Sequence, residues 1–263
     1  MNIEQIKDAF TKHVEKYNIH DDNIKLKYIH SFRVMDLCGK IANDIKLNEE
    51  DTYIALVIGL LHDYARFEQW KRYGMYSDVR SIDHADLAVE LLFENNEIEN
   101  FGIDKKYYNI IYDAIKYHNK LNCPENLNER NKLFCKIIRD ADKLDILYLF
   151  SLPGRIFKDD GSDVSKHVKD DFFNYKPIKM NVKNTKSDSV LLRLALIYDF
   201  NFKYSYKHIK DNKIMAMFFN TLENKEKFLT YFKYINDYIT KYLEERDVEY
   251  VGEEIQSFRS RKK

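Results

Sequence analysis

Residues 54–63 read IALVIGLLHD, and this stretch decides how the chain folds. Residues 54–61 are the longest apolar run, and its eight residues fall far short of the roughly 20 that a transmembrane helix requires. The run is instead typical of an element buried inside a globular protein. It ends at His62 and Asp63, and a carboxylate in such surroundings is costly unless it is paired or bound to a cation. The stretch therefore predicts a polar site at the end of a buried element.

The segments around this stretch repeat their apolar residues with helical spacing. Between residues 22 and 46, apolar side chains recur at positions 26, 29, 34, 37, 38, 41, 42 and 45. The chain has only 7 Gly and 3 Pro, whereas sheets and tight hairpins depend on such turn residues. No segment alternates polar and apolar residues as a strand does. We therefore expect an all-α protein, with helices over residues 22–46, 53–61, 81–93, 107–118, 132–150, 164–173, 187–202, 204–209, 214–222 and 225–245.

The turn at Pro153-Gly154 is the clearest interruption of this helical pattern, because proline cannot continue a helix and glycine permits a sharp turn. It could divide two domains, but no linker composition surrounds it. We therefore expect one all-α domain over residues 1–263, with a core at about 22–150 and a helical C-terminal extension at about 155–250. The basic tail at residues 257–263, SFRSRKK, is expected to be disordered.

The charges of the chain balance, with 43 Lys and Arg against 43 Asp and Glu. This balance argues against a protein that binds nucleic acid or an anionic membrane through a basic excess. The opening sequence MNIEQIKDAF lacks the apolar stretch of a secretory signal. Cys38, Cys123 and Cys135 are scattered, with no CxxC spacing, which is typical of reduced thiols. We therefore expect a cytoplasmic protein whose partners include neither a membrane nor nucleic acid.

Histidines and a further aspartate interrupt the predicted helices. A single histidine of this kind is more often a core residue than a ligand. Together with Asp63, however, they combine imidazole and carboxylate groups, which suit Mn, Fe, Ni, Zn or Mg rather than soft copper ions. Facing helices of a bundle can bring such side chains together. The residues concerned are His30, His62, His84, His118 and, in IIRDADKLDILYLF at residues 137–150, Asp142.

These motifs resemble the HD-domain superfamily of metal-dependent phosphohydrolases. The H…HD…D pattern of that family matches His30 in IHSFRVMDL, His62-Asp63 in GLLHDYARFE and Asp142 in RDADKLD, within residues 22–150. The resemblance implies a helical bundle in which these four residues bind one divalent metal ion. It points to the small, stand-alone bacterial members and leaves the subfamily unassigned.

Two further histidines are candidate ligands for a second metal ion. His84 in SIDHADLAVELL and His118 in AIKYHNK lie between the HD pair and the last aspartate. In two-metal members of the superfamily, ligands from this interval bind a second ion, and the HD aspartate, here Asp63, bridges the two. The resemblance therefore implies one or two divalent ions, among which Mn, Fe, Ni, Co, Mg and Zn are not distinguished. In the alternative, His84 and His118 line a one-metal pocket and contact substrate.

Two basic residues are candidates for a catalytic role beside Asp63. Arg66 stands three positions after Asp63, where the nucleotidase and alarmone-hydrolase branches of the superfamily carry an acid. Its guanidinium fork matches phosphate oxygens, but an ion pair with an acid such as Glu68 explains the residue equally well. Lys143 directly follows Asp142, and it either reaches into the cleft or pairs with a neighbouring acid.

The resemblance implies a hydrolase of a phosphate ester, and we expect a nucleotide-like small molecule as its substrate. Asp63 would hold the metal and orient the nucleophile. Two alternatives stay open. One is a mixed-valent di-iron oxygenase, because a minority of the superfamily uses the same ligand types to activate oxygen. The other is a nucleotide-sensing protein that keeps the fold and lacks turnover.

The C-terminal half contains one further polar pair. Arg193 and Asp199 lie in DSVLLRLALIYDFNF, on an otherwise apolar predicted helix. They either close the pocket from the other side or form a buried ion pair.

Overall fold

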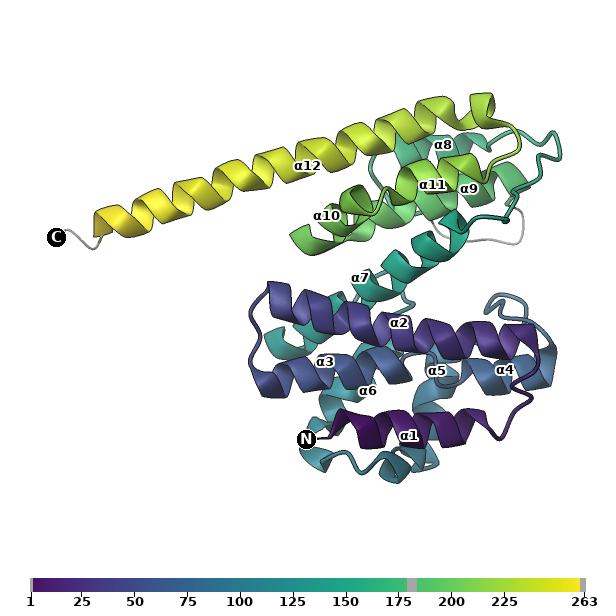
Figure 1. Ribbon diagram of the computed structural model, residues 1–263, viewed down its shortest axis with the longest axis vertical. Coiled ribbons are helices and arrows are strands. Elements are labelled where there is room, and N and C mark those ends of the chain that lie inside the picture. Colours follow the sequence, from purple (N-terminus) through teal and green to yellow (C-terminus); the bar gives the residue numbers. More distant parts are fainter. Residues whose placement is uncertain (1, 179–183, 261–263) are drawn as a thin grey trace. The chain divides into compact units, whose positions relative to one another are not determined.

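The computed structural model describes residues 2–178 and 184–260, with side chains up to residue 245, and most of this part is helical (Figure 1). The described residues contain no strand, and one isolated bridge joins Phe157 to Leu222. The predicted all-α class is therefore confirmed. The α-helices are α1 (Ile3–Val14), α2 (Asp22–Asp44), α3 (Glu49–Leu61), α4 (Arg66–Tyr73), α5 (His84–Val89), α6 (Tyr108–Tyr117), α7 (Glu129–Ser151), α8 (Lys166–Phe173), α9 (Lys186–Leu194), α10 (Lys203–Asp211), α11 (Ile214–Asn220) and α12 (Lys225–Ser260).

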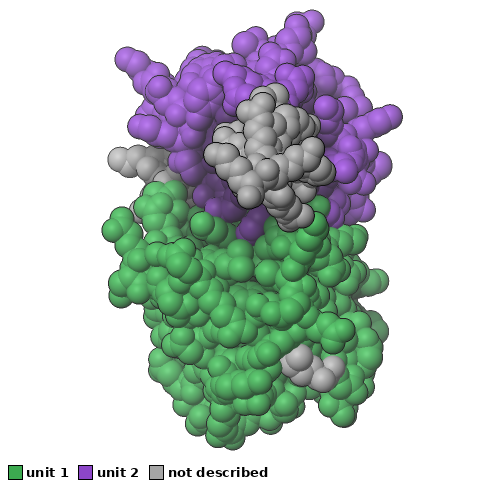
Figure 2. All heavy atoms as spheres, turned by 90° about the vertical axis from the view of Figure 1, so that its left-hand side faces the viewer, with its two compact units in different colours: residues 1–145 green, residues 146–263 purple. Residues whose placement is uncertain are grey.

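The chain divides into two compact units, residues 1–145 and residues 146–263, which Figure 2 colours separately. The division falls within α7, close to residue 150, where the predicted core ends. Each unit has its own buried apolar side chains. The interpretation of residues 1–263 as a single domain stays a prediction.

Helices α2 and α3 pack closely in unit 1 because glycine removes side chains from their contact (Figure 1). A Cβ atom on Gly59 would lie 2.7 Å from the Cα atom of Met35, and one on Gly39 would lie 2.8 Å from a methyl carbon of Leu56. Real Cβ atoms do not approach so closely, so alanine at Gly59 would push the helices apart. The close packing brings the middle of α2 next to the C-terminal end of α3.

Helix α1 was not expected from the sequence. Its N-terminus is capped by Asn2, whose side chain accepts a hydrogen bond from the backbone nitrogen of Glu4. Its buried apolar residues are Ile6, Phe10 and Val14, which recur every four positions and form one face. The apolar pattern and the cap are both visible in the sequence, although the segment is short.

Unit 2 contains the helices that follow the turn at residues 153–154. The predicted helix over residues 187–202 is shorter than expected, because α9 ends at Leu194 and a 3₁₀ turn follows over Ala195–Asp199. Helix α12 continues to Ser260, and the expected disorder of the tail at residues 257–263 stays a prediction. No proline and only one glycine, Gly252, interrupt residues 225–260, so the helix can continue. Residues 261–263 lie outside the described residues.

Candidate metal centre

All six predicted ligands come together in unit 1, carried by helices that are distant in sequence. His30 lies inside α2, and Asp142 lies on α7. The others stand at helix ends, since His62 and His118 directly follow α3 and α6, and His84 begins α5. Asp83 fixes the start of α5 by accepting hydrogen bonds from the backbone nitrogens of residues 85 and 86.

One half of the centre gathers His30, His62, Asp63 and Asp142. The Nε2 atom of His30 lies 3.2 Å from that of His62, 3.2 Å from Oδ1 of Asp142 and 3.3 Å from Oδ2 of Asp63. The Nε2 atom of His62 lies 3.5 Å from Oδ2 of Asp63 and 3.7 Å from Oδ1 of Asp142. Ligand atoms bound at about 2.0–2.2 Å to one ion lie roughly 3 to 3.5 Å apart, so these four groups can share an ion after small adjustments.

The other half gathers Asp63, His84 and His118. The Oδ1 atom of Asp63 lies 3.3 Å from Nε2 of His84 and 4.0 Å from Nε2 of His118. The two imidazoles lie 2.9 Å apart through their Nε2 atoms. Asp63 therefore presents one oxygen to each half of the centre, and its side chain is 3% exposed.

The hydrogen bonds behind the imidazoles fix which ring nitrogens face the centre. The Nδ1 atom of His62 lies 2.8 Å from the carbonyl oxygen of residue 59, and that of His118 lies 2.6 Å from the carbonyl oxygen of residue 115. His30 and His84 point Nδ1 at the carboxylates of Asp145 and Asp78, in each case at 2.6 Å. A proton on Nδ1 satisfies all four acceptors, so each Nε2 atom carries a lone pair when its ring is neutral.

Such an arrangement fits a cation. Four Nε2 lone pairs and the oxygens of two carboxylates converge in a buried space, and neutral imidazoles of this tautomer have no proton to share there. Metal-binding histidines commonly donate their other ring nitrogen to a carboxylate or a carbonyl in this way. The donor set therefore fits one or two divalent ions.

The electrostatics of the centre agree with this interpretation. Burial alone would raise the pKa of Asp63, but the charge of Lys27 and the neighbouring His62 and His30 hold it well below its usual range. Burial, followed by the charges of nearby imidazoles, lowers the pKa of His118 to about 3. Burial alone would lower the pKa of His30, but hydrogen bonds to three carboxylates raise it to about 10. A proton and a metal ion therefore compete for that half of the centre.

Arg66 contacts protein groups rather than open space. Its Nη1 atom donates to the carbonyl oxygen of Tyr76 at 2.9 Å, to Oδ1 of Asp78 at 2.8 Å and to Oε1 of Gln69 at 2.6 Å. The predicted partner Glu68 instead accepts hydrogen bonds from Tyr17 and Arg72. Arg66 thus braces the loop over residues 76–82, and the partner that sequence reasoning missed is Asp78.

Lys27 is a second residue that sequence reasoning missed. Its Nζ atom lies 2.6 Å from Oδ2 of Asp63, and its side chain is 17% exposed. Lys27 stands three positions before His30 on α2, so helical spacing alone places it on the same face. Lys143 is buried on α7, directly after Asp142.

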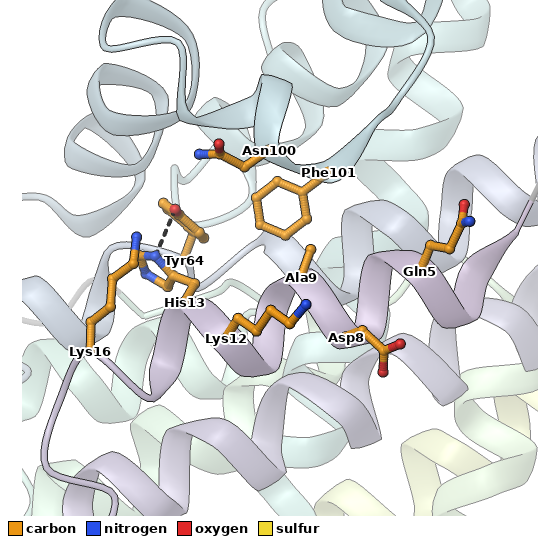
Figure 3. Close-up of a pocket in the computed structure, with 9 residues that line it drawn as sticks. All are labelled: Gln5, Asp8, Ala9, Lys12, His13, Lys16, Tyr64, Asn100 and Phe101. Carbon is orange, nitrogen blue, oxygen red and sulfur yellow. Dashed lines mark hydrogen bonds between the residues drawn. The ribbon is translucent and has the colours of Figure 1, made fainter.

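A separate pocket of about 440 Å³ in unit 1 contains none of the six predicted ligands (Figure 3). Its lining includes His13 and Tyr64, and Tyr64 directly follows Asp63 in the chain. The Tyr64 hydroxyl donates to Glu97 at 2.6 Å and lies 2.8 Å from Nδ1 of His13. Burial, followed by the charge of Lys16, lowers the pKa of His13 to about 4.

The protein-family model of the HD domain matches residues 28–147 of the sequence, which include all six predicted ligands. None of the curated proteins and none of the solved structures compared with the chain matches it. Over the described residues, no helix combines the length and the apolar character needed to cross a membrane. The match to the family model, together with the convergence of the motif residues, shows that residues 28–147 of this chain form an HD domain.

Proposed function

We propose that this protein is a metal-dependent phosphohydrolase that cleaves a nucleotide-like phosphate ester at a centre for two divalent ions. The observation that carries the proposal is the position of Asp63 between two groups of ligands. Its Oδ2 atom lies 3.3 Å from His30 and its Oδ1 atom lies 3.3 Å from His84. Divalent ions held there would lower the pKa of a water molecule and neutralise charge on phosphoryl oxygens.

The protein groups of the centre have distinct roles in this proposal. Asp63 would hold both ions and would orient the attacking water, while His30, His62 and Asp142 would complete one half and His84 and His118 the other. Lys27 is the cation positioned to contact an oxygen of the ester, because it lies beside Asp63 at the partly exposed edge of the centre. Arg66 acts as a brace, since its Nη1 atom donates to residues 69, 76 and 78 and its Nε atom donates to Oδ1 of Asp63 at 3.4 Å.

An aromatic side chain next to Lys27 supports the nucleotide-like part of the proposal. The Nζ atom of Lys27 lies 5.6 Å from the ring centroid of Tyr76, and Arg66 lies 5.8 Å from the same ring. The ring of Trp70 packs against Tyr76, with centroids 5.0 Å apart. A base could stack on Tyr76 while its phosphate contacts Lys27.

A cytoplasmic location is part of the same proposal, because no disulfide joins the cysteines of the described residues.

Metal analysis combined with a substrate screen tests the proposal. We expect the purified chain to hold close to two divalent ions and to release phosphate from nucleotides or generic esters in the presence of Mn, Ni, Co or Mg. Asp142→Asn should lose metal and activity, whereas the matched variant Asp36→Asn, on an exposed position of α2, should keep both.

Three results would contradict the proposal. One is the absence of bound metal together with the absence of ester hydrolysis. An iron spin-resonance signal with oxygen uptake and no phosphate release would indicate the oxygenase instead. Tight nucleotide binding without product over hours would indicate a sensor.

A further inference from the structure

Two arginines of unit 2 share one aromatic ring. The guanidinium carbon of Arg193 lies 3.8 Å from the ring centroid of Phe150, and that of Arg155 lies 5.4 Å from the same centroid. Arg193 also lies 5.4 Å from the centroid of Phe157. Arg193 comes from the last turn of α9, and Arg155 follows the turn that ends α7. Two positive charges therefore lie near the same aromatic ring.

No acid among the described residues forms an ion pair with either arginine. Arg193 donates through Nη1 to the carbonyl oxygen of Ser189, one turn earlier in α9. Its Nε atom is buried and has no hydrogen-bond partner within the described part of the chain. The ion pair with Asp199 that the sequence suggested is therefore not formed.

The two guanidinium groups repel each other. Burial, followed by the charge of Arg155, lowers the pKa of Arg193 to about 10. Like charges close together, one of them with a buried donor that lacks an acceptor, are unfavourable unless an anion accompanies them. The stacking of both groups on Phe150 offsets only part of this cost.

We propose that Arg155 and Arg193 form a binding site for the phosphate group of a small molecule. The Nε atom and the adjacent Nη atom of a guanidinium make a two-pronged edge that matches two oxygens of a phosphate. The Nη1 atom of Arg193 donates to the carbonyl oxygen of Ser189. The edge of the guanidinium that contains Nε is therefore the one without an acceptor in the described part of the chain. A phosphate dianion neutralises both arginines, whereas a carboxylate neutralises one.

This site shares no residue with the metal centre. Both arginines lie outside residues 28–147, and both belong to unit 2. The proposal goes beyond the proposed function, and neither depends on the other. A purely structural explanation makes a different prediction: Arg193 would be stabilised by the C-terminal end of α9 and by Phe150, and phosphate would have no effect on it.

Calorimetric titration of the full chain with inorganic phosphate, in the presence of a chelator, separates these explanations. The chelator removes divalent ions, so a failure of the metal centre does not affect the result. We expect saturable binding that Arg193→Gln and Arg155→Gln each weaken at least about tenfold. Arg193→Lys keeps the charge but loses the fork, and it should also weaken binding. Arg130→Gln, which removes an arginine paired with Asp51 in unit 1, should leave phosphate binding unchanged.

The titration can also overturn the proposal. Undetectable phosphate binding, binding unaffected by the substitutions at both arginines, or acetate binding as tight as that of phosphate would each do so. If Arg193→Gln does not fold, Arg155→Gln and Arg193→Lys carry the test, with circular dichroism as the check on folding. A melting temperature of the wild-type chain that phosphate does not raise would support the structural explanation and contradict the site.

Discussion

The carboxylate of Asp78 accepts a hydrogen bond from Nδ1 of His84 at 2.6 Å, and its other oxygen accepts one from Arg66 at 2.8 Å. Gln69 donates to that second oxygen as well, at 3.1 Å. The loop over residues 76–82 therefore determines which nitrogen of His84 faces the metal centre. This connection makes Asp78 a positioning residue for one half of the centre.

Asp78→Asn should remove the ion bound by His84 and His118. Arg66 and Gln69 both donate to Oδ1 of Asp78. In the Asp78→Asn variant, the amide oxygen should therefore face these two donors, and the NH₂ group should face His84. His84 must then accept at Nδ1 and carry its proton on Nε2, where it cannot bind metal. We expect metal content to fall from about two ions toward one, with affinity for the second ion reduced roughly 10- to 100-fold.

His118→Ala provides the comparison for this prediction, because it removes a ligand of the same half directly. Elemental analysis after dialysis against a defined metal concentration measures both variants, and Asp36→Asn serves as the control. If Asp78→Asn and His118→Ala both retain two ions, the second half is not a metal site.

Asp63→Ala should abolish binding at both halves while the fold persists. Asp63 is the side chain that offers one oxygen to each group of imidazoles, at 3.3 Å from both His30 and His84. We expect metal content near zero and no measurable hydrolysis. The far-ultraviolet circular dichroism spectrum should stay that of the wild-type chain, because a chain of this size buries enough surface to fold without metal. An unfolded Asp63→Ala variant would show that the metal is structural.

Arg66→Lys should lower stability more than it lowers phosphate-ester binding. The guanidinium donates to four protein oxygens, on Asp63, Gln69, Tyr76 and Asp78, and a lysine ammonium cannot reproduce that geometry. We expect a loss of about 1–3 kcal/mol in the free energy of unfolding, seen as a melting temperature lower by several degrees. Arg130→Lys, at an exposed ion pair, is the matched control. A normal melting temperature with a raised KM would instead assign Arg66 to substrate phosphate.

Lys27→Met should reduce turnover without reducing metal content. The ammonium of Lys27 lies 2.6 Å from the Asp63 oxygen that also faces His30. Removing that positive charge should leave affinity for divalent ions equal or higher, while an ester oxygen loses its cationic contact. We expect kcat/KM for a phosphate ester to fall about 10- to 100-fold, measured beside metal analysis of the same preparation. Unchanged turnover would show that Lys27 only balances the charge of Asp63.

His13 should make the protein less stable as the pH falls below neutrality. Its pKa is about 4 in the folded chain, against 6.5 for an unperturbed histidine. Between these values the unfolded chain binds a proton that the folded chain does not, so the free energy of unfolding decreases as the pH is lowered from about 6.5 to 4. The full effect of this group amounts to about 3 kcal/mol.

Urea unfolding of the wild-type chain and of His13→Gln, at several pH values, measures this contribution. Glutamine does not titrate, so the difference between the two curves should change across this window, and it should be constant above pH 7. Parallel curves from pH 7 to 4 would contradict the burial of a neutral His13.

The sequence by itself determined the fold class and the six candidate ligands. Helical spacing, the near absence of proline and glycine, and the position of His62-Asp63 after an apolar run are local properties, so they can be recognised without coordinates. The prediction that the motif residues form one site also relied on the resemblance to the HD family, because spacing in the sequence gives no distance between His30 and Asp142. Helix α1 was missed, although Asn2 and the buried face at residues 6, 10 and 14 were available signals.

Only the tertiary structure decided what surrounds the ligands. The ring nitrogens of His62 and His118 are fixed by carbonyls three positions earlier in the chain, which is local geometry. Those of His30 and His84 depend instead on Asp145, which is distant in sequence, and on Asp78, whose loop folds back onto Arg66. The sequence offered an ion pair with Glu68 as one of two explanations for Arg66, and an ion pair with Asp199 as one of two for Arg193. Neither ion pair is formed among the described residues. Periodicity tells which face of a helix is buried, but hydrogen bonds between segments follow from how the helices pack, and packing depends on the whole chain.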